Sequence, residues 1–434
     1  MTTTPRRPAN VRLDNLARSE LIPLFAASMD PEHVYPALRE EWGSVAAVEL
    51  DGGIPAWLVL DWDDCVRVMR EPHNFSRDVS HWAAFQNGHI APNTGLYAFF
   101  MPRDNSYYTE GRTQERLRQV VDDAFDRVDE HALAMQVREA CNHMLARVVR
   151  DGATSTDLVP NYTAFVPSLA VAAMYGLDAH DAMQLGQYAK DIFSNTPAAG
   201  PAFVGINQML GYLIHQRKER PGNDVLSAIV HWRDPNTGYG LTDKEMLDTA
   251  QMIQSAGHEM AVAWTTTTLV HLLADGDFGR RVRGGRLGVD EALDSVLVNA
   301  SPTGNTPARF VTADMEIGGR VVHAGDAITA AVGRATADAH RGGDQIWDSN
   351  SRASLAWGAG PHKCPADRIS RIIVKAAVEA VMIQLSGLRL AVPASELGVG
   401  LSLWSIRADR LPVTFDAVKQ HDVRRHNLVP AWQR

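Results

Sequence analysis

The longest stretch of helical periodicity in the chain lies in its middle third. Apolar residues recur at helical spacing from Glu130 to Leu273, and the longest single segment runs from Asp243 to about Leu273. As a helix this segment would extend about 45 Å. Thr242 and Glu245 form a capping-box pattern at its start. Since a helix that is apolar nearly all round is usually buried, we predict a long central helix here.

Two shorter parts of the chain alternate in the manner of strands. Residues 45–60 hold two apolar runs around a Gly-Gly turn, and residues 309–330 contain two further turns. Helical segments are predicted over residues 105–300 and 365–385, and residues 400–415 are expected to form a final hairpin. No linker divides these parts. The pattern therefore predicts a mainly α fold with a minor β part.

Composition narrows the class of protein. The chain has 434 residues, of which 45% are hydrophobic and 21% charged, as in an ordinary globular protein. We predict a single domain over residues 1–434. A net charge of −9 without any basic run argues against a nucleic-acid-binding protein.

Membrane insertion and disulfide bonding are not expected. No window approaches the roughly 18 unbroken apolar residues of a membrane span. The three cysteines, Cys65, Cys141 and Cys364, lie far apart and do not resemble a disulfide framework. They suit a reducing compartment, so we expect a cytoplasmic protein.

The loop from Trp357 to Arg371, WGAGPHKCPADRISR, carries the most informative chemistry. Cys364 lies just before a predicted helix, whose N-terminus would stabilise a thiolate. Gly358 and Gly360 would let the backbone approach a large flat group, and His362 could donate to it. These features suit a thiolate that binds a metal macrocycle bearing carboxylates. The alternative is a structural cysteine in a tight turn.

This loop resembles the haem-binding loop of the cytochrome P450 superfamily, F-G-x-G-x-H-x-C-x-G-x-x-L-A-R. The residues that match as they stand are Gly358, Gly360, His362, Cys364 and Arg371, and Trp357 replaces a phenylalanine. The resemblance implies that Cys364 is the metal ligand of haem b. It also implies the cytochrome P450 fold, which is predominantly helical with small β-sheets and a long central helix over the haem.

Two further segments look like parts of bacterial members of this family. RFVTADMEIGGRVVHAGDAI contains Arg309, and RLRQVVDDAF contains Arg118. By resemblance both arginines would bind haem propionates, for which a guanidinium is well suited. Gln114 stands where the family has a histidine and would also contact the haem. The alternative for either arginine is a surface side chain.

The predicted central helix departs from the family pattern A-G-x-[DE]-T. The catalytic candidates are Ala256, Gly257, His258, Glu259 and Met260. In the family the threonine hydroxyl helps to deliver protons, whereas the thioether of Met260 cannot donate a hydrogen bond. Substrate hydroxyls, water or His258 would have to compensate. Alternatively, Met260 is core packing.

The family motif E-x-x-R is also absent before Arg309. Counting back from Pro302 gives Val298 and Ser295, within SVLV, and counting from Glu291 gives EALD, which ends at Asp294; neither is E-x-x-R. In the family this motif braces the loop before the cysteine. That loop must therefore be held differently here.

The resemblance implies a haem-thiolate monooxygenase or oxidase that acts on a natural-product scaffold in bacterial secondary metabolism. Electrons would come from a ferredoxin and its reductase, which would dock near Lys363, Arg368 and Arg371. Two alternatives are oxidative coupling of aromatic substrates, such as indoles, phenols or cyclodipeptides, and a non-catalytic haem-binding protein.

The substrate is expected to be a small molecule, aromatic or a cyclic peptide, because aromatic residues are frequent in the segments expected to line the pocket. Residues 80–102 are one such segment and are expected to be irregular. The same rings could equally be core. The candidate substrate contacts are Trp82, Phe85, Phe99, Phe203, Thr303 and Trp404.

Overall fold

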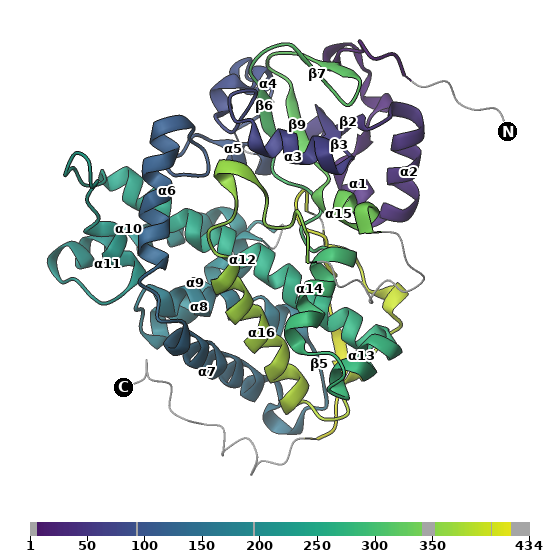
Figure 1. Cartoon of the computed structure of the whole chain (residues 1–434). Helices are drawn as coiled ribbons and strands as arrows, with labels where there is room; N and C mark the ends of the chain where they lie inside the picture. The colour runs from purple at the N-terminus through teal and green to yellow at the C-terminus, as the bar shows by residue number, and fades with distance from the viewer. Residues whose placement is uncertain (1–6, 93, 194–195, 341–351, 401, 418–434) are drawn as a thin grey trace. The chain divides into compact units, whose positions relative to one another are not determined.

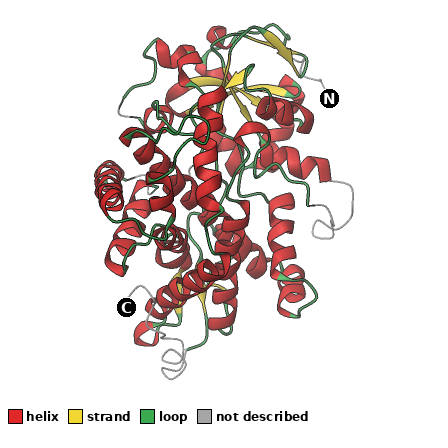
Figure 2. Ribbon diagram, turned by 60° about the vertical axis from the view of Figure 1, so that its left-hand side comes forward, coloured by secondary structure: helices red, strands yellow, loops and turns green. Residues whose placement is uncertain are grey.

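The computed structural model describes residues 7–92, 94–193, 196–340, 352–400 and 402–417. Helices form most of it, with a few short strands (Figure 2). The chain divides into two compact units: unit 1 comprises residues 1–115, 295–364 and 401–406, and unit 2 comprises residues 116–294, 365–400 and 407–434. The mainly α fold class is confirmed. The single domain stays a prediction, and each unit is described by itself.

Unit 1 is built on a six-stranded sheet with the order β1-β2-β3-β9-β6-β4. As predicted, residues 45–60 form an antiparallel pair, with Val45 opposite Val59. Strand β3 then pairs in parallel with β9, and β9 pairs antiparallel with β6. The strands are β1 (Ile22–Pro23), β2 (Val45–Leu50), β3 (Ile54–Val59), β4 (Phe75–Ser76), β6 (Arg309–Val311) and β9 (Ala327–Ala330), with β7 (Met315–Ile317) and β8 (Arg320–Val322) as a separate hairpin.

Short helices cover the sheet of unit 1. Strand β2 is buried along its whole length, which explains why its sequence is apolar without alternation. The expectation of an irregular segment at residues 80–102 was wrong in part, because two short helices form there. The helices are α1 (Leu24–Met29), α2 (Pro31–Trp42), α3 (Trp62–Arg70), α4 (Ala83–Gln86), α5 (Gly95–Phe100) and α15 (Val332–His340).

Unit 2 is a helical assembly around α12 (Asp243–Ala274), the predicted central helix. Its capping box forms as expected, with the Glu245 backbone N–H donating to the Thr242 hydroxyl at 3.2 Å. Helix α12 packs against α8, α10 and α16, and α16 packs against α7 (Figure 1). The other helices are α7 (Glu130–Val148), α8 (Val166–Met174), α9 (Ala179–Ile192), α10 (Ala199–Glu219), α11 (Val225–Val230), α13 (Gly276–Arg283) and α16 (Asp367–Gln384).

The boundary between the units falls within two helices, α6 (Gly111–Phe125) and α14 (Val289–Asn299). Unit 2 also holds a small sheet of β5 (Ser155–Asp157), β10 (Arg389–Leu390) and β11 (Pro412–Thr414). The predicted final hairpin forms only near its base, where Val399 bridges Ala408, because β11 pairs with β5 and β10 instead. Within the described ranges, no helix combines the length and apolarity needed to cross a membrane.

The cysteine loop of unit 1 packs closely on α3. Gly358 and Gly360 have φ angles of 70° and 72°, which glycine adopts without strain. A Cβ on Gly360 would lie 2.5 Å from the backbone oxygen of Met69, at the end of α3. The structure therefore gives Gly360 a role that the sequence analysis did not foresee, namely contact with α3.

Replacement of Gly360 by alanine should destabilise unit 1 by two effects. The left-handed φ costs about 1–2 kcal/mol, and the overlap with Met69 adds about 1–3 kcal/mol. Gly88→Ala is the matched control, because Gly88 has a φ of 69° and nothing within 4 Å of the added Cβ. Thermal unfolding should show a clearly larger fall in Tm for Gly360→Ala. Equal falls would contradict the packing argument.

Candidate active site

Backbone hydrogen bonds fold the cysteine loop into successive tight turns. The Cys364 N–H donates to the Trp357 carbonyl at 2.8 Å, and the Lys363 N–H donates to the Gly360 carbonyl at 3.0 Å. Cys364 is part-exposed and lies just before α16. The loop thus fixes the backbone of the predicted ligand while its side chain remains accessible.

Two arginines of unit 1 are buried near this loop without enough acceptors. Arg309 is 1% exposed, and its Nη1 donates to the Phe75 carbonyl at 3.3 Å. Arg77 is 7% exposed, and its guanidinium lies 4.2 Å from the Tyr107 ring centroid. The Nε and Nη1 atoms of Arg77 and the Nε of Arg309 are buried and donate to no described residue. Buried charged donors of this kind are normally paired with an anionic acceptor, because an unpaired buried charge is costly.

The pairing of β4 with β6 explains why the two arginines lie together. Ser76 is opposite Phe310 in this antiparallel pair, so the next residues along, Arg77 and Arg309, lie at the same end. Burial, with the Arg77 charge second, lowers the pKa of Arg309 to about 9. Like charges at such positions are destabilising unless something negative lies between them.

One carboxylate of unit 1 reaches this cluster. Glu110 accepts from the Arg77 backbone N–H at 2.6 Å and lies 3.0 Å from Nε2 of His362. Burial, and then the charges of Arg77 and Arg309, lower the pKa of His362 to about 4, although Glu110 opposes the shift. A neutral His362 therefore donates from Nε2 to Glu110. This single carboxylate leaves two arginines to share one negative charge.

The other two predicted haem contacts have protein partners. Gln114 is buried in unit 1, and its Nε2 donates to the Pro361 carbonyl at 3.0 Å. It therefore holds the cysteine loop directly. Arg118, in unit 2, pairs with Asp122 at 2.8 Å. Contact of either residue with a cofactor stays a prediction.

In unit 2, α12 presents a short accessible face. Ala256 is exposed, and Glu259 and Met260 are part-exposed, although most neighbouring positions of α12 are buried. Helical spacing places these three residues on one side. Gly257 faces α8, because a Cβ there would lie 3.5 Å from the Val171 side chain. The small residue at 256 leaves space beside Glu259 and Met260.

His258 does not share this face. It is 2% exposed, its Nδ1 lies 2.8 Å from the Ser168 hydroxyl, and its ring stacks on Phe193 with centroids 5.2 Å apart. Burial, and then the charge of Arg407, lower its pKa to about 3. His258 is therefore buried against α8, and its role in place of the missing hydroxyl stays a prediction.

Glu259 has a cationic neighbour that the sequence analysis missed. The Nε of Arg407 lies 3.5 Å from Oε1 of Glu259, and both side chains are mostly buried, at 14% and 13% exposure. The Gly400 N–H donates to the Arg407 carbonyl at 2.9 Å, which fixes this arginine at the base of the C-terminal loop. Glu259 and Arg407 are far apart in the sequence and meet only in the folded chain, so no local sequence pattern predicted their contact.

The predicted substrate contacts of unit 1 fall into two groups. The Phe99 and Trp404 rings are part-buried, with centroids 5.3 Å apart, and Phe85 stacks on Tyr97 at 5.6 Å. Thr303 forms a bridge with Ser405. These contacts leave the substrate role of Phe85, Phe99, Thr303 and Trp404 as a prediction.

Trp82 belongs to the second group. It is 1% exposed and stacks on Phe310 with centroids 5.0 Å apart, inside the hydrophobic core of unit 1. It packs as a core residue here, and its contact with substrate stays a prediction. Phe203, on α10 of unit 2, is part-exposed and stays a prediction.

The predicted partner-docking residues differ in their surroundings. Lys363 is exposed in unit 1. Arg368, exposed in unit 2, lies 3.5 Å from Asp126 and from Glu130. Arg371 was expected to offer charge to a carboxylate-bearing group or a partner, but it pairs with Asp294 at 2.5 Å.

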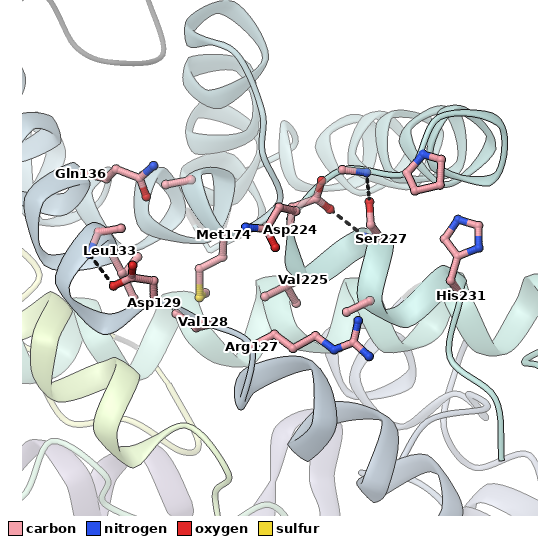
Figure 3. A pocket seen from close by; sticks show the side chains of 16 residues that line it. Arg127, Val128, Asp129, Leu133, Gln136, Met174, Asp224, Val225, Ser227 and His231 are labelled. Carbon is pink, nitrogen blue, oxygen red and sulfur yellow. Dashed lines mark hydrogen bonds between the residues drawn. The ribbon is translucent and has the colours of Figure 1, made fainter. Parts of the chain in front are cut away.

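A pocket of about 390 Å³ in unit 2 is separate from these residues. Figure 3 shows it between α7, the end of α8 and the segment that leads into α11. Its two main carboxylates already serve the protein: Asp129 caps α7, and Asp224 caps α11 and pairs with Arg217 at 2.9 Å. No residue predicted as a site residue lines it, so it is not the candidate site.

Comparison with known proteins decides the family. The chain is 24% identical to a 2-hydroxy-5-methyl-1-naphthoate 7-hydroxylase of Streptomyces carzinostaticus, over 85% of this chain and 92% of that protein. It is 26% identical to the cytochrome P450 monooxygenase PikC of Streptomyces venezuelae, over 86% of this chain and 88% of that protein. The solved structure of CYP154C4 from Streptomyces sp. W2061 matches with a TM-score of 0.82 and 24% identity, over 92% of this chain and 98% of that one.

The chain is therefore similar to cytochrome P450s in sequence over most of its length, and it has their fold. No family model matches it. The P450 fold, the oxidoreductase activity and the cofactor haem b, all expected from the cysteine loop, are confirmed.

The residues of unit 1 fit haem b. Its two propionates are the kind of anion that the buried nitrogens of Arg77 and Arg309 lack. Cys364 provides an accessible sulfur just before a helix N-terminus, where a thiolate is stabilised. Arg77 was not identified from the sequence, although its place after the strand beside Arg309 could have indicated it.

Replacement of Arg77 by glutamine should weaken haem retention by this P450. Loss of one charge-assisted contact to a propionate should raise the rate of haem transfer to apomyoglobin roughly tenfold. Arg112→Gln is the control, since Arg112 is exposed at the start of α6. If the two variants release haem equally fast, Arg77 does not hold the cofactor.

The stability of this P450 should fall in acid partly through His258. Its pKa is about 3 in the folded state, against the ordinary histidine value of 6.5 in the unfolded chain. Above pH 6.5 the ring is neutral in both states and contributes no pH dependence. Below pH 6.5 His258 binds a proton in the unfolded chain but not in the folded chain. The free energy of unfolding therefore falls by up to about 1.4 kcal/mol per pH unit.

The variant His258→Gln should therefore lose less stability than the wild type between pH 6.5 and pH 4, whatever its stability at neutral pH. The control is His215→Gln, since the His215 side chain is 70% exposed. Unfolding in urea at several pH values measures the difference. Parallel pH profiles for wild type and His258→Gln would show that this ring takes no part.

Proposed function

We propose that this P450 inserts oxygen into an aromatic natural-product scaffold of bacterial secondary metabolism. The observation that supports the proposal most is the accessible face of α12, where Ala256 leaves space beside Glu259 and Met260. Its relative from Streptomyces carzinostaticus is named as a hydroxylase of a hydroxynaphthoate, which is an aromatic acid.

In this proposal the Cys364 thiolate would hold the haem iron, and Arg77 and Arg309 would neutralise the propionates. Haem b held by a thiolate would supply the activation of dioxygen, with electrons from outside the chain. Glu110 and Gln114 hold the cysteine loop through His362 and Pro361.

Proton delivery in this proposal depends on Glu259. Arg407 holds the direction of the Glu259 side chain, because Nε of Arg407 lies 3.5 Å from Oε1 of Glu259 in a mostly buried setting. Met260 cannot relay a proton from this carboxylate. A hydroxyl or acidic group of the substrate, or a water that it orders, completes the relay.

The rings of unit 1 support an aromatic substrate. Phe99 and Trp404 are part-buried and already arranged as neighbouring rings, an arrangement that accepts a further aromatic group. Electrons are proposed to come from a ferredoxin and its reductase, with Lys363 and Arg368 as the exposed cations nearest in sequence to Cys364.

Oxidative coupling of aromatic substrates is a second candidate, and Met260 is the observation that favours it. Coupling removes hydrogen atoms from two substrate positions and needs no delivery of oxygen to carbon. A site with a weakened proton relay suits such a reaction.

Turnover under labelled dioxygen separates the candidates. The holoenzyme would be supplied with NADPH, a surrogate ferredoxin and reductase, and a panel of hydroxynaphthoates, indoles and cyclodipeptides. Oxygen insertion predicts a product that contains one labelled oxygen atom. A product that lacks two hydrogen atoms and carries no label would replace the proposal with coupling. NADPH consumption that no panel member stimulates would contradict both.

Replacement of Met260 by threonine should restore a hydroxyl to the proton relay. We expect unchanged haem content and a roughly two- to tenfold smaller release of hydrogen peroxide per NADPH consumed. Met252→Thr is the control, because Met252 is also part-exposed on α12. If Met260→Thr changes neither peroxide release nor product yield, the residue is core packing.

A further inference from the structure

The absence of the E-x-x-R motif leaves open what braces the segment that carries Cys364. In unit 2, α14 carries Asp294, at the end of the stretch EALD. Its carboxylate is 12% exposed and lies 2.5 Å from Nη2 of Arg371, whose side chain is 33% exposed. The cation of this pair comes from α16.

The two helices carry a second ion pair in matching register. Lys375 lies one turn after Arg371 on α16, and Asp290 lies one turn before Asp294 on α14. Nζ of Lys375 is 2.5 Å from Oδ2 of Asp290. The helices therefore align antiparallel through two equivalent pairs.

The two pairs differ in their surroundings. The Lys375 and Asp290 side chains are 37% and 42% exposed, as expected of a surface pair. The Arg371 guanidinium lies 5.7 Å from the Trp264 ring centroid, and Trp264 Nε1 donates to the Leu293 carbonyl at 3.3 Å. Arg371 of α16 thus contacts both α12 and α14. Lys375 contacts α14 in a pair whose two side chains are both part-exposed.

Arg371 is also the nearer of the two cations to the cysteine. It lies in the second turn of α16, and Cys364 precedes that helix directly along the chain. A helix whose first turns are fixed determines the direction in which the preceding loop leaves it. If the first turns of α16 were mobile, the position of the Cys364 sulfur would vary.

We propose that Asp294 and Arg371 are positioning residues for the Cys364 thiolate in a chain that lacks the E-x-x-R motif. The proposal rests on Cys364 being the haem ligand. Neither residue touches the reacting atoms. Their effect is to keep the sulfur within bonding distance of iron when the protein fluctuates.

The test uses the visible spectrum of the holoenzyme instead of its activity. Reduction under carbon monoxide gives a Soret band far to the red when the axial ligand is a thiolate, and a band at shorter wavelength when the thiolate is lost. The rate of conversion between the two bands in mild urea reports how firmly the sulfur is held. The variants are Asp294→Asn, Arg371→Gln and their combination.

We expect each single variant to convert roughly tenfold faster than the wild type, because it leaves a mostly buried charge without its partner. The double variant should convert no faster than the faster single variant, because both changes remove one shared interaction. Asp294→Glu keeps the charge and should convert at nearly the wild-type rate. Asp290→Asn breaks the equivalent exposed pair and should change the rate less than twofold.

Two results would overturn the proposal. One is that Asp294→Asn and Asp290→Asn convert at the same rate. The other is that Asp294→Glu converts as fast as Asp294→Asn, which would show that the charge is irrelevant. Should a single variant lose haem during purification, the haem content of Asp294→Asn still decides when it is compared with the haem content of Asp294→Glu and Asp290→Asn.

Different results would contradict the assignment of Cys364 as the haem ligand. A wild-type protein without the thiolate band, or a Cys364→Ser variant that retains it, would remove the ligand role and leave the Asp294–Arg371 pair as a structural contact only. If the wild type shows the thiolate band and Asp294→Asn converts at the wild-type rate, Cys364 remains the ligand and the positioning role of Asp294 and Arg371 is rejected.

Discussion

The burial of two guanidinium groups side by side is the constraint on which the site of unit 1 depends. Arg77 and Arg309 lie at one end of the β4–β6 pair, and Glu110 is the carboxylate among the described residues that reaches them. A folded protein rarely keeps such groups without acceptors, since each unsatisfied buried donor costs about 1–3 kcal/mol. The protein is therefore built to receive anions at this place, and the propionates of haem b are anions of the right kind.

The departures from the family pattern are compensated by contacts between residues far apart in the sequence. The missing histidine of α6 is Gln114, which holds the carbonyl of Pro361. The stretch EALD, which is the near match to E-x-x-R, ends at Asp294, and Asp294 pairs with Arg371. The lost threonine of α12 is different, because the thioether of Met260 cannot donate a hydrogen bond.

The two units supply different kinds of side chain. Unit 1 has two buried guanidinium groups and the tight loop that contains Cys364. In unit 2, α12 carries the part-exposed Glu259, with Arg407 at 3.5 Å, next to the buried His258. Under the proposed function, the charges of unit 1 would hold the cofactor and Glu259 would take part in turnover.

The sequence by itself determined the family, the cofactor, the central helix with its cap, and the position of Cys364. These features depend on local spacing: a loop motif fixes its own turns, and helical periodicity of apolar residues fixes α12. Only the tertiary structure decided that Arg77 joins Arg309, that Arg407 meets Glu259, that His258 turns away and that Trp82 is core. Each of these depends on strand register or helix packing between segments distant in sequence, and no local pattern encodes which of many possible partners a buried charge or ring will meet.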